Sequence, residues 1–435
     1  MKLTIIGTGY VGLVTAVCFA EKGHNVTCLD VDEEKIKLLN KGIPTIFENN
    51  LLDLMKRNAS RLFFTTDSSK SYIDSGCVFI CVGTPEKQDG SANLKFVWSV
   101  IKDLAATVKD KCVVVIKSTV PVGTNVKVSK YLAEHKNKNA EFYVVSNPEF
   151  LSQGSAVHDT LYASRIVIGT NDDYAENTML EVYKSFDVPK VIVNPQSAEM
   201  IKYASNDFLA LKISYINEIA NLCELVDADV NDVVKGMGLD KRIGNKFLQA
   251  GIGYGGSCFP KDTKALHWIS AFYDKELKTI KAAIEVNAQQ KLLLIKKARK
   301  YYDSFESLKV AVLGVTFKPG TDDMREAPSL VSIPVFLEDG ANVYVYDPVG
   351  ENNLRKLFKG SLNYCKTPQE ALLNADICFI FTEWQEIKEL KFGDFSLMKK
   401  MLILDGRNCY DLENVKKYPV IYESIGRQAV KNIKW

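Results

Sequence analysis

Long apolar runs, an excess of charge of one sign and clustered histidines are all missing from this sequence of 435 residues. The longest apolar stretches, such as 78–82, are as long as a strand and far shorter than the ~20 residues that cross a bilayer, so we expect no membrane segment. With 55 basic and 53 acidic side chains, the net charge of +2 offers no field for a polyanion, and we expect no nucleic-acid partner. The four histidines show no HxxxH or HExxH spacing, so the sequence predicts no metal site.

Paired cysteines are missing as well, because none of the ten cysteines belongs to a CxxC motif. Most of them lie in apolar, strand-like or helix-like segments, which predicts nine buried and reduced thiols and a cytoplasmic protein. The first residues, MKLTIIGTGYVG, pass from a short apolar stretch directly into glycines. This pattern favours a first strand over a signal peptide.

Short β-branched runs alternate with helical patterns at both ends of the chain. The strands expected in the first part are 3–6, 25–29, 78–82, 113–117, 142–146 and 165–168, and those in the last part are 309–313, 342–346, 376–381 and 401–404. Such alternation predicts parallel sheets with helices on both faces. Between the two parts, the segment 197–225 contains neither proline nor glycine and has apolar residues at helical spacing, which predicts one long helix.

The expected fold class is therefore α/β, with two Rossmann-like, doubly wound parallel-sheet domains joined by a long central helix and an all-helical middle region. We place the domain boundaries at 1–196, 197–300 and 301–435. The length agrees with this division, since about 150 residues form a typical domain.

A dinucleotide-binding pattern follows the first expected strand. Gly7, Gly9 and Gly12 form a GxGxxG motif that opens a helical segment, and glycines there let the backbone approach a pyrophosphate. Asp30 ends the second expected strand, where a carboxylate accepts the ribose hydroxyls and repels a 2′-phosphate. The pattern predicts NAD rather than NADP, and the alternative is a structural glycine turn.

A second constellation is the segment GIGYGGSCFPKD at 251–262. Its glycines pack poorly in a core, which favours a loop wrapped around a ligand. Cys258 is followed by Pro260, a residue typical of a first helical turn. We expect Cys258 at a helix N-terminus, where the dipole favours the thiolate of a nucleophile. The alternative is one more buried apolar residue.

Weaker signals are a lysine and several turns. Lys202 and Asn206 lie four residues apart on the long helix and share a face, so they could donate hydrogen bonds to an alkoxide. Considered alone, Lys202 is better explained as a solvated helix residue. The turns 82–85, 117–123 and 147–150 each follow an expected strand, on the side where open sheets bind ligands.

Five motifs, GTGYVG, KSTVPVG, NPEFL, GYGGSCFPKD and GVTFKPGTDDMREAP, follow in this order. Together they make the chain resemble the UDP-glucose 6-dehydrogenases within the wider UDP-sugar dehydrogenase superfamily. The resemblance covers nearly the whole length. It implies NAD-dependent, four-electron oxidation of UDP-glucose to UDP-glucuronate, through a thiohemiacetal and a thioester on Cys258.

The resemblance also implies the site residues. The implied catalytic residues are Cys258, Lys202, Asn206, Asp262, Thr119 and Glu149. The implied cofactor contacts are Gly7, Gly9, Tyr10, Val11, Gly12, Asp30, Lys35, Thr84, Thr119, Gln153, Lys261 and Arg325. The implied substrate contacts are Glu149, Phe150, Leu151, Lys202, Asn206, Arg242, Phe247, Leu248, Gln249, Ala250, Gly251, Gly255, Lys318 and Arg407. The family is usually dimeric through the central helices, which implies a homodimer in which Arg242 reaches the sugar of the neighbouring subunit.

One position departs from the family pattern. The family commonly has a second glutamate four positions after the first, where this sequence has Gln153. Glutamine exchanges hydrogen bonds but carries no charge, so any base role rests on Glu149 or Asp262. Two alternatives stay open: a dehydrogenase of another UDP-hexose, such as an N-acetylated amino sugar, or a dinucleotide sensor without turnover.

Overall fold

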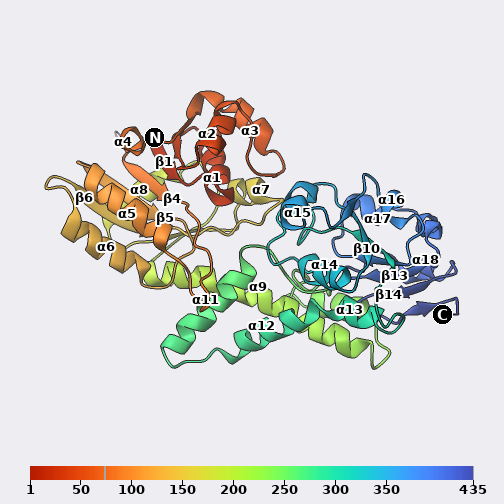
Figure 1. Ribbon diagram of the computed structural model, residues 1–435. Coiled ribbons are helices and arrows are strands. Elements are labelled where there is room, and N and C mark those ends of the chain that lie inside the picture. Colours follow the sequence, from red (N-terminus) through yellow and green to blue (C-terminus); the bar gives the residue numbers. More distant parts are fainter. Residues whose placement is uncertain (73–74, 435) are drawn as a thin grey trace. The chain divides into compact units, whose positions relative to one another are not determined.

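The computed structural model describes residues 1–72 and 75–434. The chain separates into two compact units, Met1–Ser205 and Asn206–Trp435, which Figure 1 colours from red to yellow and from green to blue. The further division at 196 and 300 that we expect from the sequence stays a prediction.

The first unit is built on an eight-stranded sheet in the order β3-β2-β1-β4-β5-β6-β7-β8. Its strands are β1 (Lys2–Ile6), β2 (Asn25–Leu29), β3 (Leu62–Thr65), β4 (Cys77–Ile80), β5 (Lys111–Ile116), β6 (Glu141–Ser146), β7 (Ile166–Gly169) and β8 (Lys190–Val193). Its helices are α1 (Tyr10–Glu21), α2 (Glu33–Asn40), α3 (Leu51–Arg57), α4 (Ser68–Ser71), α5 (Lys95–Thr107), α6 (Thr124–His135), α7 (Ala156–Leu161) and α8 (Asp173–Val182), with a 3-10 turn at Ala59–Arg61.

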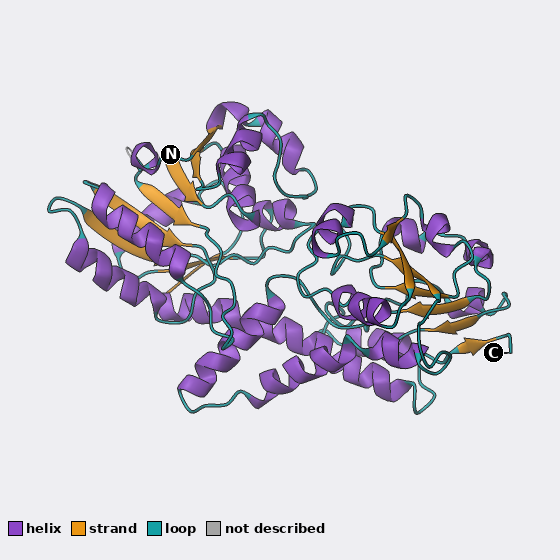
Figure 2. Ribbon diagram, in the orientation of Figure 1, coloured by secondary structure: helices purple, strands orange, loops and turns teal. Residues whose placement is uncertain are grey.

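Helices cover both faces of this sheet (Figure 2). Residues of α1, α2, α3, α7 and α8 pack on one face, and residues of α5 and α6 pack on the other. The central strand β4 is buried along its whole length, as expected of a strand covered on both sides. The strand order reverses between β1 and β4, and ligands of open α/β sheets bind at such a switch point.

The second unit contains a seven-stranded sheet in the order β11-β10-β9-β12-β13-β14-β15. Its strands are β9 (Lys309–Leu313), β10 (Asn342–Tyr346), β11 (Asn363–Tyr364), β12 (Ile377–Ile380), β13 (Leu402–Asp405), β14 (Ile421–Glu423) and β15 (Val430–Lys431). Its helices are α10 (Val230–Gly238), α11 (Phe259–Phe272), α12 (Lys278–Gln290), α13 (Leu293–Ala298), α14 (Ser329–Glu338), α15 (Glu351–Leu357), α16 (Pro368–Leu372), α17 (Gln385–Lys388) and α18 (Leu412–Val415), with a 3-10 helix at Phe392–Leu397.

Helix α9 (Pro195–Cys223) has 29 residues and begins in the first unit and ends in the second. The single long helix predicted from the sequence is confirmed, and its start moves to Pro195 because proline is favoured in the first turn. From α9 to α13 the described residues form helices without a strand between them. The two Rossmann-like α/β regions and the helical middle region are therefore confirmed.

The sheets differ in one respect from the expected purely parallel ones. Strand β7 is antiparallel to β6, and β15 is antiparallel to β14. The other pairings in both sheets are parallel. Antiparallel strands near the edge of a mostly parallel sheet are common, and alternation of apolar residues does not encode strand direction.

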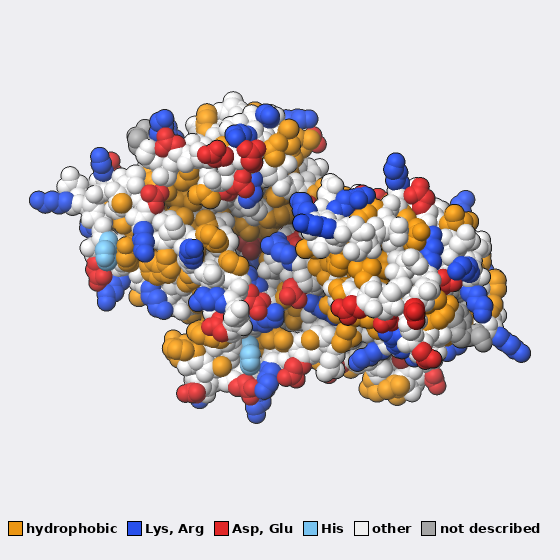
Figure 3. Space-filling view, viewed as in Figure 1, with side chains coloured by type: hydrophobic (Ala, Val, Ile, Leu, Met, Phe, Trp, Pro, Cys, Tyr) orange, Lys and Arg blue, Asp and Glu red, His pale blue; other side chains and the backbone are white. Residues whose placement is uncertain are grey.

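Basic and acidic side chains are interspersed over the face drawn in Figure 3. This mixture is what a net charge of +2 leads one to expect. Among the described residues, no helix combines the length and the apolar character that crossing a membrane requires.

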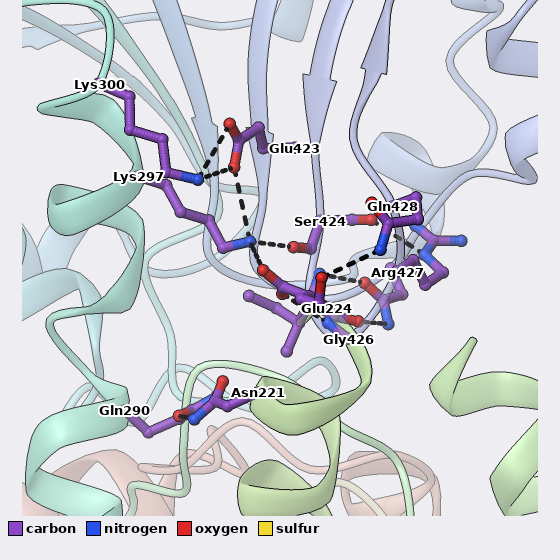
Figure 4. A network of polar contacts seen from close by, with 12 residues as sticks. Asn221, Glu224, Gln290, Lys297, Lys300, Glu423, Ser424, Gly426, Arg427 and Gln428 are labelled. Atoms are coloured by element: carbon purple, nitrogen blue, oxygen red, sulfur yellow. Dashed lines mark hydrogen bonds and ion pairs between the residues drawn. The ribbon is translucent and has the colours of Figure 1, made fainter. Parts of the chain in front are cut away.

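A buried polar network ties the end of α9 to the last strands (Figure 4). The ammonium group of Lys297 donates to a carboxylate oxygen of Glu224 at 2.6 Å and to the backbone oxygen of Ser424 at 2.8 Å, and it lies 3.5 Å from Glu423. Glu224 also accepts from the backbone N–H of Gly426 at 2.8 Å. One buried cation therefore holds two carboxylates from distant parts of the chain.

Replacing this cation, Lys297→Met, should destabilise the protein by about 3 kcal/mol, because it removes the buried ammonium that Glu224 and Glu423 share. The matched control is Lys300→Met, which removes a half-exposed lysine from the same Glu423 and should cost less than about 1 kcal/mol. Urea unfolding followed by circular dichroism at pH 7 compares the two variants. Equal losses would show that Lys297 has no special role.

Candidate active site

The glycine motif after β1 has the geometry of a dinucleotide loop. Gly7 has a φ of +93°, and a Cβ there would lie 2.9 Å from the backbone oxygen of Cys81. A Cβ on Gly12 would lie 1.8 Å from the oxygen of Gly7. Gly9 is the N-cap of α1, and a Cβ on it would meet nothing within 4 Å. Two glycines thus permit close packing, and the third leaves space where backbone N–H groups at a helix N-terminus can bind phosphate.

Asp30 lies directly after β2, beside this loop. Its carboxylate accepts from the backbone N–H and the hydroxyl of Thr8, both at 2.7 Å, and from the backbone N–H of Asp32 at 3.0 Å. Burial alone would raise the pKa of Asp30, but these hydrogen bonds bring it below the ordinary value. The group is therefore an anion at neutral pH, fixed beside the glycine loop, as recognition of a ribose requires.

The other expected cofactor residues of the first unit surround the same edge of the sheet. The hydroxyl of Thr84, after β4, donates to the backbone oxygen of Thr119 at 2.8 Å, after β5. Val11 packs against the core from the first turn of α1. Lys35 is on α2, with its ammonium 3.6 Å from Asp32.

Tyr10 contacts the carboxylate of Glu48, a residue that the sequence analysis did not single out. Its hydroxyl hydrogen-bonds Glu48, and both groups accept from the backbone N–H of Gly154, at 2.9 Å from Tyr10 and 2.7 Å from Glu48. Gly154 follows Gln153, the position where the family usually has a glutamate. Glu48 is buried, and its second carboxylate oxygen has no hydrogen-bond partner among the described residues. A carboxylate is thus present next to Gln153, although it comes from another loop.

The next feature is a buried ion pair. The ammonium of Lys202, on α9, lies 2.9 Å from a carboxylate oxygen of Glu149, and both side chains are nearly inaccessible to solvent. The other oxygen of Glu149 accepts from the backbone N–H of Leu151 at 2.9 Å. Burial raises the pKa of Glu149, but the lysine and this N–H bring it below its ordinary value. Lys202 is therefore not a solvated helix residue.

Phe150 covers this pair with its ring. The ammonium of Lys202 lies 5.5 Å from the ring centroid, and the guanidinium of Arg165 lies 3.9 Å from it. The ring therefore lies within cation–π distance of both groups.

In the second unit, Asn206 binds an aspartate of the cysteine segment. Its amide donates to Asp262 at 2.7 Å, and Lys261 pairs with the other carboxylate oxygen of Asp262. Asp262 belongs to the first turn of α11 and is buried. The sequence did not predict this pairing, because residues 206 and 262 come from different helices.

Asp207 is a second carboxylate of this region that the sequence analysis missed. It is 2% exposed, and neither of its oxygens has a hydrogen-bond partner among the described residues. Burial, together with the charge of Asp262, raises the pKa of Asp207 to about 8. A usable signal existed, since Asp207 lies at helical spacing from the buried Tyr203 and Ala210 and so belongs to the buried face of α9.

Cys258 is the residue directly before α11, with Pro260 in the first turn, as predicted. It is half-buried, and its sulfur lies 3.8 Å from the hydroxyl of Ser257. None of the ten cysteines, all of them described, forms a disulfide, and eight of the other nine are buried. The expectation of nine buried thiols is wrong for Cys409, which is half-buried because it lies in a loop after β13.

The glycines at 251–256 pack against protein. A Cβ on Gly255 would lie 2.5 Å from the backbone oxygen of Glu326, and one on Gly256 would lie 2.8 Å from the ring of Phe317. The loop is also held from α12, where the Asn287 side chain accepts from the N–H of Tyr254 at 2.7 Å. Close approach of two protein segments thus accounts for these glycines, and a loop that wraps a ligand stays a prediction.

The remaining expected residues of the second unit fall into two groups. Arg407 reaches this loop: its guanidinium donates to the backbone oxygens of Phe381, Gly253 and Phe317. Lys318 follows Phe317, and Arg325 forms a two-pronged ion pair with Asp323.

The other group comes before the glycine loop. Gly251 and Leu248 are buried, and Phe247 is exposed with a left-handed φ of 62°. Gln249 is exposed and Ala250 half-buried. Arg242 is exposed and pairs with Asp240 at 2.6 Å.

The structure thus brings together Lys202, Glu149 and Phe150 in the first unit, and Asn206, Asp262 and Lys261 in the second. Helix α9 carries a member of both, with Lys202 in the first unit and Asn206 four residues later in the second. Within the described part of the chain, no cluster of His, Cys, Asp or Glu has an arrangement that could hold a metal ion.

Comparison with known proteins agrees with this architecture. Residues 1–187, 196–289 and 311–412 match, in turn, the NAD binding domain, the central domain and the UDP binding domain of the UDP-glucose/GDP-mannose dehydrogenase family. The chain belongs to this family. The first unit therefore contains its NAD binding domain, and the open loop at Gly9 together with Asp30 fits that cofactor.

Relatives are similar over the full length. The UDP-glucose 6-dehydrogenase YwqF of Bacillus subtilis (strain 168) is 47% identical over 99% of this chain and 98% of its own, and the UDP-glucose 6-dehydrogenase of Rhizobium meliloti (strain 1021) is 46% identical over 98% and 100%. The structure of a UDP-glucose dehydrogenase from Pyrobaculum islandicum has a TM-score of 0.90 and 37% identity, covering 97% of this chain and 96% of its own.

The buried Asp207 allows a test of pH-dependent stability. Between the ordinary aspartate pKa of 3.8 and about 8, the folded state holds a proton that the unfolded state releases, so stability falls as pH rises through this window. Asp207→Asn should remove this loss, with a gain in unfolding free energy that grows by about 2 kcal/mol from pH 5 to pH 7. Urea unfolding at several pH values measures it.

The control is Asp232→Asn at an exposed position of α10, which should show the pH dependence of the unchanged protein. A gain for Asp207→Asn that is the same at pH 5 and pH 7 would mean that Asp207 is ionised in the folded state.

Proposed function

We propose that this protein oxidises the C6 alcohol of UDP-glucose to the carboxylate of UDP-glucuronate, with two NAD reduced and one water consumed. The observation that carries the proposal is Cys258, a half-buried cysteine outside any disulfide, at the start of α11 and four residues before Asp262. A nucleophile at a helix N-terminus suits the capture of an aldehyde as a covalent intermediate. The full-length similarity to UDP-glucose 6-dehydrogenases supports the choice of sugar nucleotide.

NAD is held by the first unit. The backbone N–H groups at the start of α1 bind the pyrophosphate, and Asp30 accepts the hydroxyls of a ribose. Further contacts with NAD in this unit come from Thr84, Thr119 and Lys35. The family resemblance implies three more NAD contacts, from Lys261, Arg325 and Gln153. When bound, NAD accepts a hydride in each of the two oxidations.

Lys202 and Asn206 donate hydrogen bonds to the C6 oxygen and stabilise its negative charge. Each donor is already oriented by a carboxylate, Lys202 by Glu149 and Asn206 by Asp262. Such preorganisation avoids the cost of arranging the groups during the reaction. Asp262 and Thr119 position water and transfer protons.

The sulfur of Cys258 adds to the C6 aldehyde and forms a thiohemiacetal, whose oxidation leaves a thioester. Water attacks the thioester carbon, the C–S bond breaks, and the carboxylate product is released while the thiolate stays on Cys258. Glu149, which Lys202 keeps ionised, accepts the proton of this water. The UDP-sugar is bound by Phe150, Leu151, the loop 247–251 with Gly255, Lys318 and Arg407.

We also propose that the protein is a cytoplasmic homodimer. Phe208, Tyr215 and Leu222 recur every seven residues along α9 and are 61%, 47% and 54% exposed, which is the pattern of an apolar helix face that packs on a partner. Arg242, exposed in the neighbouring loop, reaches the sugar site of the second copy. Ten cysteines outside any disulfide favour a reducing compartment.

The function is tested by the number of NADH formed per UDP-glucose, read at 340 nm with limiting sugar and excess NAD. Two NADH per sugar are expected. No NADH from a folded preparation that binds NAD would contradict the proposal. Turnover of a UDP-N-acetylhexosamine instead would select the other substrate class, in line with the UDP-D-MAnNAc dehydrogenase from Pyrococcus horikoshii that shares 28% identity.

The thioester route is tested by Cys258→Ser. The variant should bind NAD normally and lose more than about 10³-fold in the steady rate of UDP-glucuronate formation, because serine lacks the thiolate. Cys409→Ser, at the other half-buried cysteine, should keep the rate within about twofold. UDP-glucuronate formed by Cys258→Ser at the normal rate would exclude the covalent intermediate.

The dimer is tested by Leu222→Asp, which places a charge in the proposed apolar contact. Sedimentation velocity should show twice the 48.6 kDa chain mass for the unchanged protein and the single mass for the variant. A variant that still sediments at twice the mass would place the contact elsewhere.

A further inference from the structure

Helix α6 begins without a cap of its own. Its N-cap is Gly123, with a φ of +91° and no side chain to accept from the first N–H groups. Exposed donors at a helix start need an acceptor. The acceptor is Glu199 of α9, whose two carboxylate oxygens accept from the backbone N–H of Gly123 at 2.6 Å and of Asn125 at 2.8 Å.

Glu199 joins three parts of the first unit. Gly123 ends the loop 117–123, which follows β5 and carries Thr119. The hydroxyl of Ser146, at the end of β6, lies 3.5 Å from the same carboxylate. Glu199 also precedes Lys202 by three residues on α9, and the two side chains line one small pocket together with Thr119 and Pro148. A single carboxylate thus connects the loop of Thr119 to the helix of Lys202.

The charge of Glu199 responds to pH near neutrality. Burial raises its pKa to about 7, against the hydrogen bonds from Asn125, Gly123 and Ser146. The cation that favours its ionised form is Lys127 of α6, while Lys202 in the same pocket is paired with Glu149. A protonated carboxyl group turns one acceptor oxygen into a donor, so protonation weakens its hold on the two N–H groups.

We propose that Glu199 is a positioning residue, whose ionised carboxylate fixes the Thr119 loop against the Lys202 helix and so makes NAD-dependent turnover more efficient above pH 7 than below it. The inference rests on the roles that we propose for Thr119 and Lys202. Glu199 acts through its neighbours and has no contact with the reacting atoms in this account.

The test is Glu199→Gln, a neutral side chain of the same shape, with kcat/KM for NAD measured from pH 6 to pH 9. The ratio of variant to unchanged enzyme should fall from about 1 at pH 6 to about 0.1 at pH 8.5, because only the ionised glutamate holds both N–H groups strongly. The change should lie mainly in KM for NAD. Taking the ratio removes the pH dependence of every other group.

Glu134→Gln, at the exposed end of the same helix α6, is the matched control and should give a ratio near 1 at every pH. Glu199→Asp keeps an ionisable group, so its ratio should vary less with pH than that of Glu199→Gln; this variant also serves if the glutamine variant does not fold.

The outcomes separate the two proposals. If the unchanged enzyme forms no NADH from UDP-glucose, the proposed function is wrong, whatever Glu199 does. If it is active and the Glu199→Gln ratio is constant between pH 6 and pH 8.5, or stays near 1 throughout, the positioning role is overturned.

Discussion

The buried ion pair between Lys202 and Glu149 is the interaction on which the arrangement of the first unit's candidate site depends. Neither charge could be buried alone at an acceptable cost, because an isolated ion loses its hydration without compensation. The pair therefore fixes the NPEF turn after β6 to helix α9. Phe150 lies near the same lysine. The need to pair these two charges therefore positions the NPEF turn, the Phe150 ring and helix α9 together.

The same requirement recurs along α9. Glu199 satisfies the uncapped start of α6, Asn206 binds Asp262, and Glu224 is held by Lys297 near the last strands. These contacts explain how polar groups along α9 and directly after it are buried. Asp207 is the exception, because no neighbour among the described residues satisfies its carboxyl group, and it avoids the cost by keeping its proton.

Most of the sheet strands could be predicted, and those that were missed are short. The expected ranges coincide with β2, β9 and β10 and differ by a few residues for β1, β4 and β5. The missed strands include β3, with four residues, and β11 and β15, with two each. The two-residue strands are too short to show a period, and the pairing of all three depends on neighbours that the local sequence does not contain.

By itself, the sequence determined the local chemistry of this protein: the glycine turn before α1, Asp30 at the end of β2 and Cys258 at the start of α11. Each follows from residues within a few positions of one another, where backbone geometry and side-chain type suffice. The tertiary structure alone decided that Glu199 caps α6, that Glu48 lies beside Gly154 and that the glycines after residue 250 pack on protein. These contacts join residues more than 30 positions apart, and the free energy of burying polar groups and close-packing backbones selects them only once the chain has folded.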